Sequence, residues 1–463
     1  MLKDQVIKDV LITALSTGAD FAEIFLEDKV SNNLQAEGGV ISSANNSHIK
    51  GAGIRVFKEK EVVYGYSNNL ETDKLLKLAS DLASSFNGAP IISEIIFNKT
   101  SSKDKHKAKI HPKDVSIEQK AKYITDAHNY AKSYDECISQ TRITLSDVAQ
   151  EILIVNSNGK YVTDTRVRTR IYITSIASKD GQMQTGSEGP GGLVGYELFD
   201  EINLKEVAID TARVAKTMAE AEECPSKEMP VIMNNGFGGV IFHEACGHPL
   251  EATTVARGLS VFCGKLGTKI ASELVTAIDD ATIPNAWGSG NIDDEGNPTE
   301  NIVLIKDGIL KSYLVDSFNT RLMDHELRSC GRRESYKFMP TSRMSNTFID
   351  NGTSTFDEII ENTEYGLFAA RLGGGSVNPI TGDFNFAVME GYIVENGKIS
   401  KPVRGATLVG NGAEVLHKID MIADNLERAQ GMCGSSSGSI PADVGQPTLR
   451  VSKMTVGGRK GAN

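Results

Sequence analysis

The sequence has no long apolar run. Within its 463 residues, no stretch approaches the roughly 18 consecutive apolar residues that a membrane-spanning helix needs. Its opening segment, MLKDQVIKDVLITAL, alternates charged with apolar residues and has neither a continuous apolar core nor a small-residue cleavage site, unlike an export signal. We therefore expect a cytoplasmic protein without a membrane role of its own.

An excess of positive charge is missing as well. Lys and Arg number 49 against 60 Asp and Glu, which gives a net charge of -11 and a sequence pI near 5.4. Proteins that bind nucleic acids neutralise phosphates with clustered Lys and Arg, so the balance argues against a nucleic-acid partner. The one basic run, residues 99–109, is mixed with Ser, Asp and His, and we interpret it as a solvated loop.

Cysteine is scarce, and its six copies include no CxxC pair. Scattered cysteines in a reducing cytosol are usually free and pack as small apolar side chains. We expect this of five of the six cysteines: Cys137, Cys224, Cys246, Cys263 and Cys330.

The sequence does contain enough apolar residues for two cores. Hydrophobic residues make up 40% of a chain that is longer than one core usually spans. We predict an α+β protein with an N-terminal α/β domain over residues 1–224, whose helices pack on a sheet, and a β-rich C-terminal domain over residues 225–463. The glycine-rich segment 186–192 indicates either a loop over a site or a boundary. Helical periodicity predicts helices over residues 2–16, 71–85, 116–133 and 204–221, and strand patterns occur at residues 21–30, 51–57, 61–66, 143–148 and 151–156.

One segment of the second half carries the residues of a metal site. An apolar helical stretch ends in His243-Glu244-Ala-Cys-Gly-His248. The zinc-peptidase pattern HExxH places two histidines four apart, about 40° from one another around a helix. A spacing of five gives about 140° in a regular helix, which prevents shared coordination. We therefore predict that the helix ends near Gly247 and that Pro249 keeps His248 out of the helical region. The alternative is a pair of hydrogen-bonded core histidines with Glu244 as a buried partner.

A catalytic zinc with two histidine ligands needs a third protein ligand. Cys433 lies in a glycine- and serine-rich loop, where nothing calls for a buried apolar thiol, and a thiolate there would partly neutralise the ion. Cys246 points away from both histidines on a regular helix, so packing suits it better. His325 and His417 are the other candidate ligands.

Several long motifs resemble the TldD/PmbA family of metallopeptidases, and specifically its TldD-type catalytic subunit. They are HEACGHPLEA from His243, GSGNIDDEGNPTENIVLIKDGILKSYL from Gly288, GRRESYKFMPTSRMSNT from Gly331, YGLFAARLGGGSVNPITGDFNF from Tyr365 and GQPTLRVSKMTVGG from Gly445.

The resemblance implies a zinc-dependent peptidase of short or unfolded peptides. It makes His243, His248 and Cys433 the metal ligands and Glu244 the base that activates a zinc-bound water. It also implies a homodimer, or a heterodimer with a metal-free TldE/PmbA-type subunit. Pro249 departs from the glycine expected after the second histidine. Two rival hypotheses stay open: a non-catalytic peptide-binding subunit with a structural zinc, and a peptidase in which a histidine activates Cys433 as a nucleophile.

Residues outside the metal ligands are candidates for substrate binding. Arg332 and Arg333 suit a substrate carboxylate or the oxyanion of the scissile carbonyl, or else structural ion pairs with Glu334 or Asp324. Gly374 and Gly375, within Gly-Gly-Gly, leave backbone open for an extended peptide to pair as an added strand. Tyr336 and Asn346 are further polar candidates, and Asp293-Asp-Glu295 indicates a solvated turn rather than a cation site.

Overall fold

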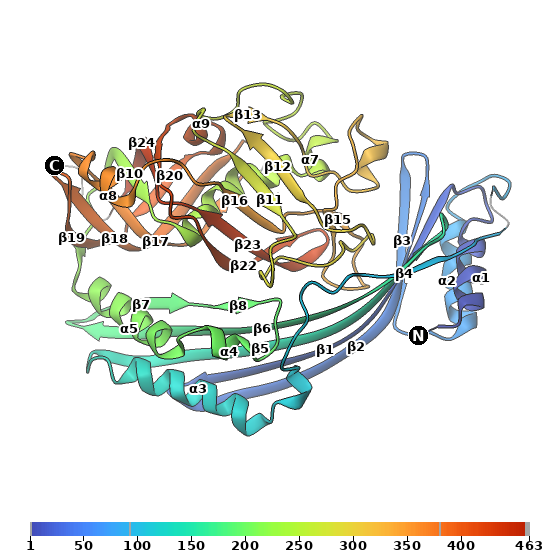
Figure 1. Cartoon of the computed structure of the whole chain (residues 1–463), viewed down its shortest axis with the longest axis horizontal. Coiled ribbons are helices and arrows are strands. Elements are labelled where there is room, and N and C mark those ends of the chain that lie inside the picture. The colour runs from blue at the N-terminus through green and yellow to red at the C-terminus, as the bar shows by residue number, and fades with distance from the viewer. Residues whose placement is uncertain (1, 92–93, 379–380, 459–463) are drawn as a thin grey trace.

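The computed structural model describes residues 2–91, 94–378 and 381–458, and it has the predicted α+β architecture. A long sheet from the N-terminal half curves beneath the β-rich C-terminal part (Figure 1). Within the described residues, no helix is long and apolar enough to cross a membrane.

The N-terminal sheet is antiparallel except at one short edge strand. Its order is β3-β2-β1-β5-β6-β4, with β7 and β8 also paired to β6. Side chains alternate between its faces, so Ile24 packs under the helices while Phe25 faces C-terminal segments. The strands are β1 (Phe21–Glu37), β2 (Val40–Lys58), β3 (Glu61–Ser67), β4 (Asn98–Ser101), β5 (Ile138–Asn156), β6 (Lys160–Lys179), β7 (Gln182–Glu188) and β8 (Gly191–Gly192).

These strands are longer than the sequence pattern predicts. The strand patterns at residues 21–30 and 51–57 cover only parts of β1 and β2; the remaining residues of β2 are largely exposed, and those of β1 are mostly polar. The two strands predicted at 143–148 and 151–156 are one continuous strand, β5. Exposed polar strand residues give no apolar alternation, which explains why the pattern missed them.

The four predicted N-terminal helices are confirmed, each within three residues of its expected ends. Helices α1 and α2 pack on one end of the sheet, and α3 and α5 pack on β5, β6 and β7 toward the other (Figure 1). They are α1 (Asp4–Ala14), α2 (Thr72–Ala83), α3 (Ile117–Lys132) and α5 (Leu204–Glu220), joined by the short elements η1 (Pro112–Asp114) and α4 (Leu198–Glu201).

The C-terminal part is built around two sheets that share one apolar core. The chain enters the first of them at Glu222, just before the predicted boundary at residue 224. That sheet contains β9 (Glu222–Glu223), β10 (Lys227–Met233), β17 (Tyr365–Val377), β18 (Asp383–Glu395), β19 (Lys398–Arg404), β20 (Thr407–Asn411), β21 (Ile419–Ile422) and β24 (Leu449–Gly457). The second contains β11 (Ala277–Asp280), β12 (Asn301–Lys306), β13 (Ile309–Leu310), β16 (Asn346–Ile349), β22 (Glu427–Ser435) and β23 (Gly438–Gln446).

Short elements connect these strands. Strands β14 (Gly331–Arg332) and β15 (Thr341–Ser342) form a separate pair. The short helices are η2 (Gly236–Gly239), α6 (Val240–Phe242), η3 (His243–Gly247), η4 (His248–Leu250), α7 (Ala252–Val255), η5 (Asn319–Arg321), α8 (Phe356–Glu361) and α9 (Gly412–His417).

A buried set of ion pairs joins the N-terminal sheet to the C-terminal part. We call it the charge cluster: Glu23, Arg55, Arg166, Asp294, Glu295 and Arg333. Arg55 bridges Glu23 at 3.0 Å and Glu295 at 2.7 Å, Arg166 binds Asp294 at 2.6 Å, and Arg333 binds Glu23 at 2.8 Å. The prediction of a solvated turn at residues 293–295 is therefore wrong, because all three acidic side chains are buried.

Candidate metal centre

The motif helix does not end at Gly247, contrary to prediction. Residues His243–Gly247 form a π-helical turn, in which the backbone N–H of His248 donates to the carbonyl of His243, five residues earlier. His248 keeps helical backbone angles, φ -58° and ψ -41°, despite the following Pro249. A π-helical turn contains more residues than an α-helical turn, so residues five apart lie on one face. His243 and His248 can therefore point the same way without a helix break.

Close packing explains the glycine in this turn. A side chain at Gly247 would place its Cβ 2.2 Å from the sulfur of Met344, while the backbone of Gly247 is itself helical. Glycine is needed here because there is no space for a side chain, and not because the helix ends. Pro249 lies in the first turn of η4, where its missing N–H costs little.

The turn and strand β22 bring three metal-binding side chains together. The Cys433 sulfur lies 3.2 Å from Nε2 of His243 and 3.3 Å from Nε2 of His248. The three donor atoms lie within 4.8 Å of one another, and both His243 and Cys433 are buried. Among the described residues, this is the one group of three or more His, Cys, Asp or Glu side chains with metal-binding geometry.

Electrostatics favour the thiolate form of Cys433. Burial alone would raise the pKa of this thiol, but His243 and His248 together lower it to about 3. Burial by itself would lower the pKa of His248, yet Glu251 and Cys433 raise it well above its usual range. The thiolate is the form of cysteine that binds a cation, and the raised pKa of His248 means that this ring gives up a proton when a metal takes Nε2.

These donors fit zinc. Tetrahedral zinc with typical bonds to nitrogen and sulfur separates the two ligand atoms by about 3.5 Å, close to both nitrogen–sulfur distances here. Two imidazoles and a thiolate are also a ligand set that zinc commonly takes. Glu244, whose side chain is 33% exposed, places Oε2 3.7 Å from Nε2 of His248, beside the three donors.

Two further residues at this centre, Glu251 and Arg343, were not predicted from the sequence. Glu251 places Oε2 3.0 Å from Nδ1 of His248, on the side of the ring opposite Cys433. The guanidinium of Arg343 lies between Glu251 and the chain around Cys433. The three-residue spacing from His248 could have identified Glu251, whereas Arg343 is distant in sequence from every ligand.

The other candidate residues lie outside this group. The guanidinium of Arg332 donates to the carbonyls of Met344 and Pro441, and Arg333 pairs with Glu23. Neither pairs with Glu334 or Asp324, and both are committed to protein acceptors. Asn346 is likewise engaged with Asp280 and Ser289.

The remaining cysteines and histidines add no ligand. Cys246 is buried against the carbonyl of Gly412, which agrees with a packing role. Neither His325 nor His417 belongs to the group of metal-binding side chains. Tyr336 is buried with Phe25 and Ile152, on the face of the N-terminal sheet that meets the C-terminal part.

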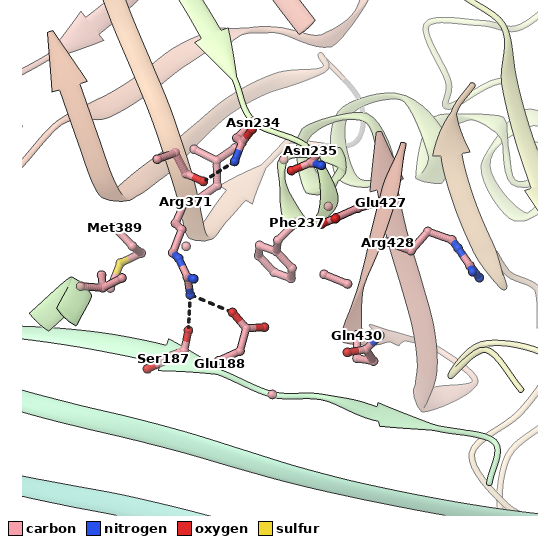
Figure 2. A pocket seen from close by; sticks show the side chains of 18 of the residues that line it. Ser187, Glu188, Asn234, Asn235, Phe237, Arg371, Met389, Glu427, Arg428 and Gln430 are labelled. Atoms are coloured by element: carbon pink, nitrogen blue, oxygen red, sulfur yellow. Dashed lines mark hydrogen bonds and ion pairs between the residues drawn. The ribbon is translucent and has the colours of Figure 1, made fainter. Parts of the chain in front are cut away.

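A cavity of about 400 Å³ lies between the N-terminal sheet and the C-terminal part (Figure 2). Gln430, three residues before Cys433 on β22, lines it, so the cavity edge and the ligand are separated by roughly 10 Å along the strand. Gly374 also lines it and has open space where a side chain would be, because the glycines form a bulge in the pairing of β17 with β18. Gly375 packs against Phe386 instead.

The cavity has charged and apolar walls. Arg371 from β17 reaches across to Glu188 of β7 at 2.7 Å, and Phe237 and Met389 also line the space (Figure 2). Residues 186–192, expected to form a loop or a boundary, lie mostly in strands β7 and β8, and they contribute a wall of the cavity through Ser187, Glu188 and Gly189.

Known proteins match the chain along nearly its whole length. Residues 22–85 match the PmbA/TldA metallopeptidase domain 1, residues 110–219 the central domain and residues 226–458 the C-terminal domain. A "Metalloprotease TldD homolog" of Haemophilus influenzae is 35% identical over 449 residues, which cover 95% of this chain and 93% of that protein. A metalloprotease of Methanocaldococcus jannaschii is 34% identical over 436 residues, 93% of this chain and 96% of that one.

Two solved structures share the fold. TldE from Thermococcus kodakarensis superposes with a TM-score of 0.77 at 18% identity, covering 95% of this chain and 97% of that one. A Thermotoga maritima protein gives a TM-score of 0.79 at 20% identity, covering 94% of this chain and 96% of that one.

Proposed function

The chain belongs to the PmbA/TldA (TldD/PmbA) metallopeptidase family, and we propose that it is a zinc-dependent peptidase of short or unfolded peptides. The observation that carries the proposal is the convergence of His243, His248 and Cys433 from two distant segments, with Glu244 beside them. When bound, zinc supplies Lewis acidity, which polarises a peptide carbonyl and lowers the pKa of water.

The protein's own residues then move the proton. The carboxylate of Glu244 is partly exposed and close to the ligands, so it is placed to accept a proton from the attacking water and to pass it to the leaving amine. His243 and Cys433 are held by burial, and His248 by the contact of its Nδ1 with Glu251, which keeps their orientation constant through the reaction.

The cavity beside the centre suits a peptide chain. It lies between the N-terminal sheet and β22, so a flexible chain can enter where a folded domain is excluded. Gly374 offers unobstructed backbone in its wall, which supports main-chain contacts with little side-chain preference. Arg332 and Arg333, already bonded within the protein, act in this proposal as scaffold residues rather than as substrate ligands.

The rival functions make different demands on the centre. A purely structural zinc is usually closed by four protein ligands, and three donors converge here among the described residues. A cysteine nucleophile would work without metal, so inhibition by a chelator and recovery with zinc separates that mechanism from ours. We further propose a cytoplasmic protein that pairs with a second copy of itself or with a metal-free TldE-type subunit, since a solved TldE has this same fold.

The test is cleavage of an unstructured peptide by the wild type and by Glu244→Gln. We expect a loss of about 10²- to 10⁴-fold in kcat/KM with zinc retained, because proton transfer is removed while the ligands remain. Glu414→Gln, at an exposed carboxylate on α9, is the matched control and should cleave normally. Equal cleavage by wild type and Glu244→Gln, with and without the candidate partner subunit, would refute the proposal.

A further inference from the structure

Glu251 and Arg343 form a buried link between two of the candidate ligands. Glu251 accepts a hydrogen bond from Nδ1 of His248 at 3.0 Å, and its other oxygen lies 3.8 Å from Nε of Arg343. Glu251 is 3% exposed, and the side chain of Arg343 is completely buried. A charged pair this deep costs folding free energy, so its placement needs a reason.

Arg343 also holds the chain segment that follows Cys433. Its guanidinium donates to the carbonyl of Cys433, to Oγ of Ser437 at 2.8 Å and to the carbonyl of Gly438 at 3.0 Å. These acceptors span the turn between β22 and β23. One side chain therefore sets the position of the strand that presents the sulfur and contacts the carboxylate behind His248.

The contact of Glu251 determines which ring nitrogen of His248 is free. A carboxylate beside Nδ1 holds the N–H on that nitrogen, so in the neutral ring the lone pair is on Nε2, the nitrogen that faces Cys433. Carboxylates placed this way behind metal-binding histidines fix ring orientation and raise ligand basicity.

We propose that Glu251 and Arg343 are positioning residues that preset His248 and Cys433 for the metal. This inference rests on the proposed function, because it assigns the pair a role toward the same zinc. It predicts that the two residues act through ligand geometry and metal affinity and do not contact the substrate.

The experiment measures binding of zinc alone and the visible spectrum of the cobalt(II)-substituted protein. Glu251→Leu should bind zinc about 10- to 100-fold more weakly than the wild type. Glu251→Gln should recover most of the affinity, because its amide oxygen still accepts from Nδ1. Arg343→Met should shift the thiolate-to-cobalt and d–d bands, since the backbone of Cys433 is released.

A second buried pair supplies the matched controls. Glu23 and Arg55 have the same chemistry and burial but lie in the charge cluster. Glu23→Leu and Arg55→Met should lower thermal stability while leaving zinc affinity and the cobalt spectrum unchanged. If Glu251→Leu does not fold, Glu251→Asp keeps the charge, withdraws the carboxylate by one methylene and should still weaken zinc binding.

The outcomes separate the two claims. Wild-type zinc affinity and spectra in the Glu251 and Arg343 variants, or equal losses in the controls, overturn the positioning role while the proposed function stands. Failure of the wild type itself to bind zinc overturns the proposed function.

Discussion

The metal centre and the charge cluster both join segments that are far apart in sequence, and both are buried, but their polar groups are satisfied differently. In the charge cluster every carboxylate faces an arginine: burial alone would raise the pKa of Asp294, yet Arg166 and Arg333 lower it overall. In the metal centre, two imidazole nitrogens and a sulfur point at one another.

This difference is the one expected between a structural cluster and a candidate binding site. Opposite charges in the first complete one another and need nothing further. The second gathers lone-pair donors at one point, an arrangement that a cation completes.

Breaking the charge cluster should cost the most stability. Arg55→Met leaves Glu23 and Glu295 with one charged partner fewer in a buried position. We expect the free energy of unfolding to fall by about 3–5 kcal/mol, measured by chemical denaturation at pH 7. Zinc bound per folded chain should not change. A loss below about 1 kcal/mol would contradict the structural role of the charge cluster. A loss of zinc would show that the cluster and the candidate metal centre are not separate in function.

A buried carboxylate whose arginine partner is more distant should have its pKa shifted in the opposite direction to that of Asp294. Burial raises the pKa of Asp443 from 3.8 to about 6, and its nearest cation, Arg428, is 3.9 Å away. The folded state then binds this proton more tightly than the unfolded state, so the contribution to stability is full below pH 4 and disappears as pH rises to about 6.

Asp443→Asn should remove that dependence. The stability difference between wild type and variant should change by up to about 3 kcal/mol between pH 4 and pH 7, measured by denaturation at each pH. Asp420→Asn, at an exposed carboxylate paired with Arg450, is the control and should show no such change. Parallel pH profiles for wild type and Asp443→Asn would contradict the assignment.

The sequence could select the candidate ligands, but it could not predict the geometry that brings them together. His243, Glu244, His248 and Cys433 could be selected because their side-chain chemistry has few alternatives in their contexts. The π-helical turn could not be predicted, because the close approach of Met344 to Gly247 is a contact between distant segments.

The burial of polar residues was also not predicted from the sequence. Asp293-Asp-Glu295 has the composition of a solvated turn, but Arg55 of β2 and Arg166 of β6 pair with Glu295 and Asp294, while Asp293 accepts from backbone N–H groups and the amide of Asn297. The helices of the first half were predictable because their apolar stripes repeat locally. Long-range pairing of charges has no such local signature.

The smallest effect is expected at the cysteine inside the motif. Cys246 is buried and contacts the carbonyl of Gly412, and burial raises the pKa of its thiol. Cys246→Ala should cost about 1 kcal/mol in the free energy of unfolding and leave zinc content unchanged. Loss of zinc from this variant would mean that the ligands have been assigned to the wrong cysteine.

Zinc content of the purified wild type and of Cys433→Ser, determined by elemental analysis on folded protein, tests the central claim most directly. We predict about one zinc per chain in the wild type and almost none in the variant, because two histidines alone hold the ion weakly. Equal zinc in both proteins, or none in the wild type, would contradict the metal centre formed by His243, His248 and Cys433.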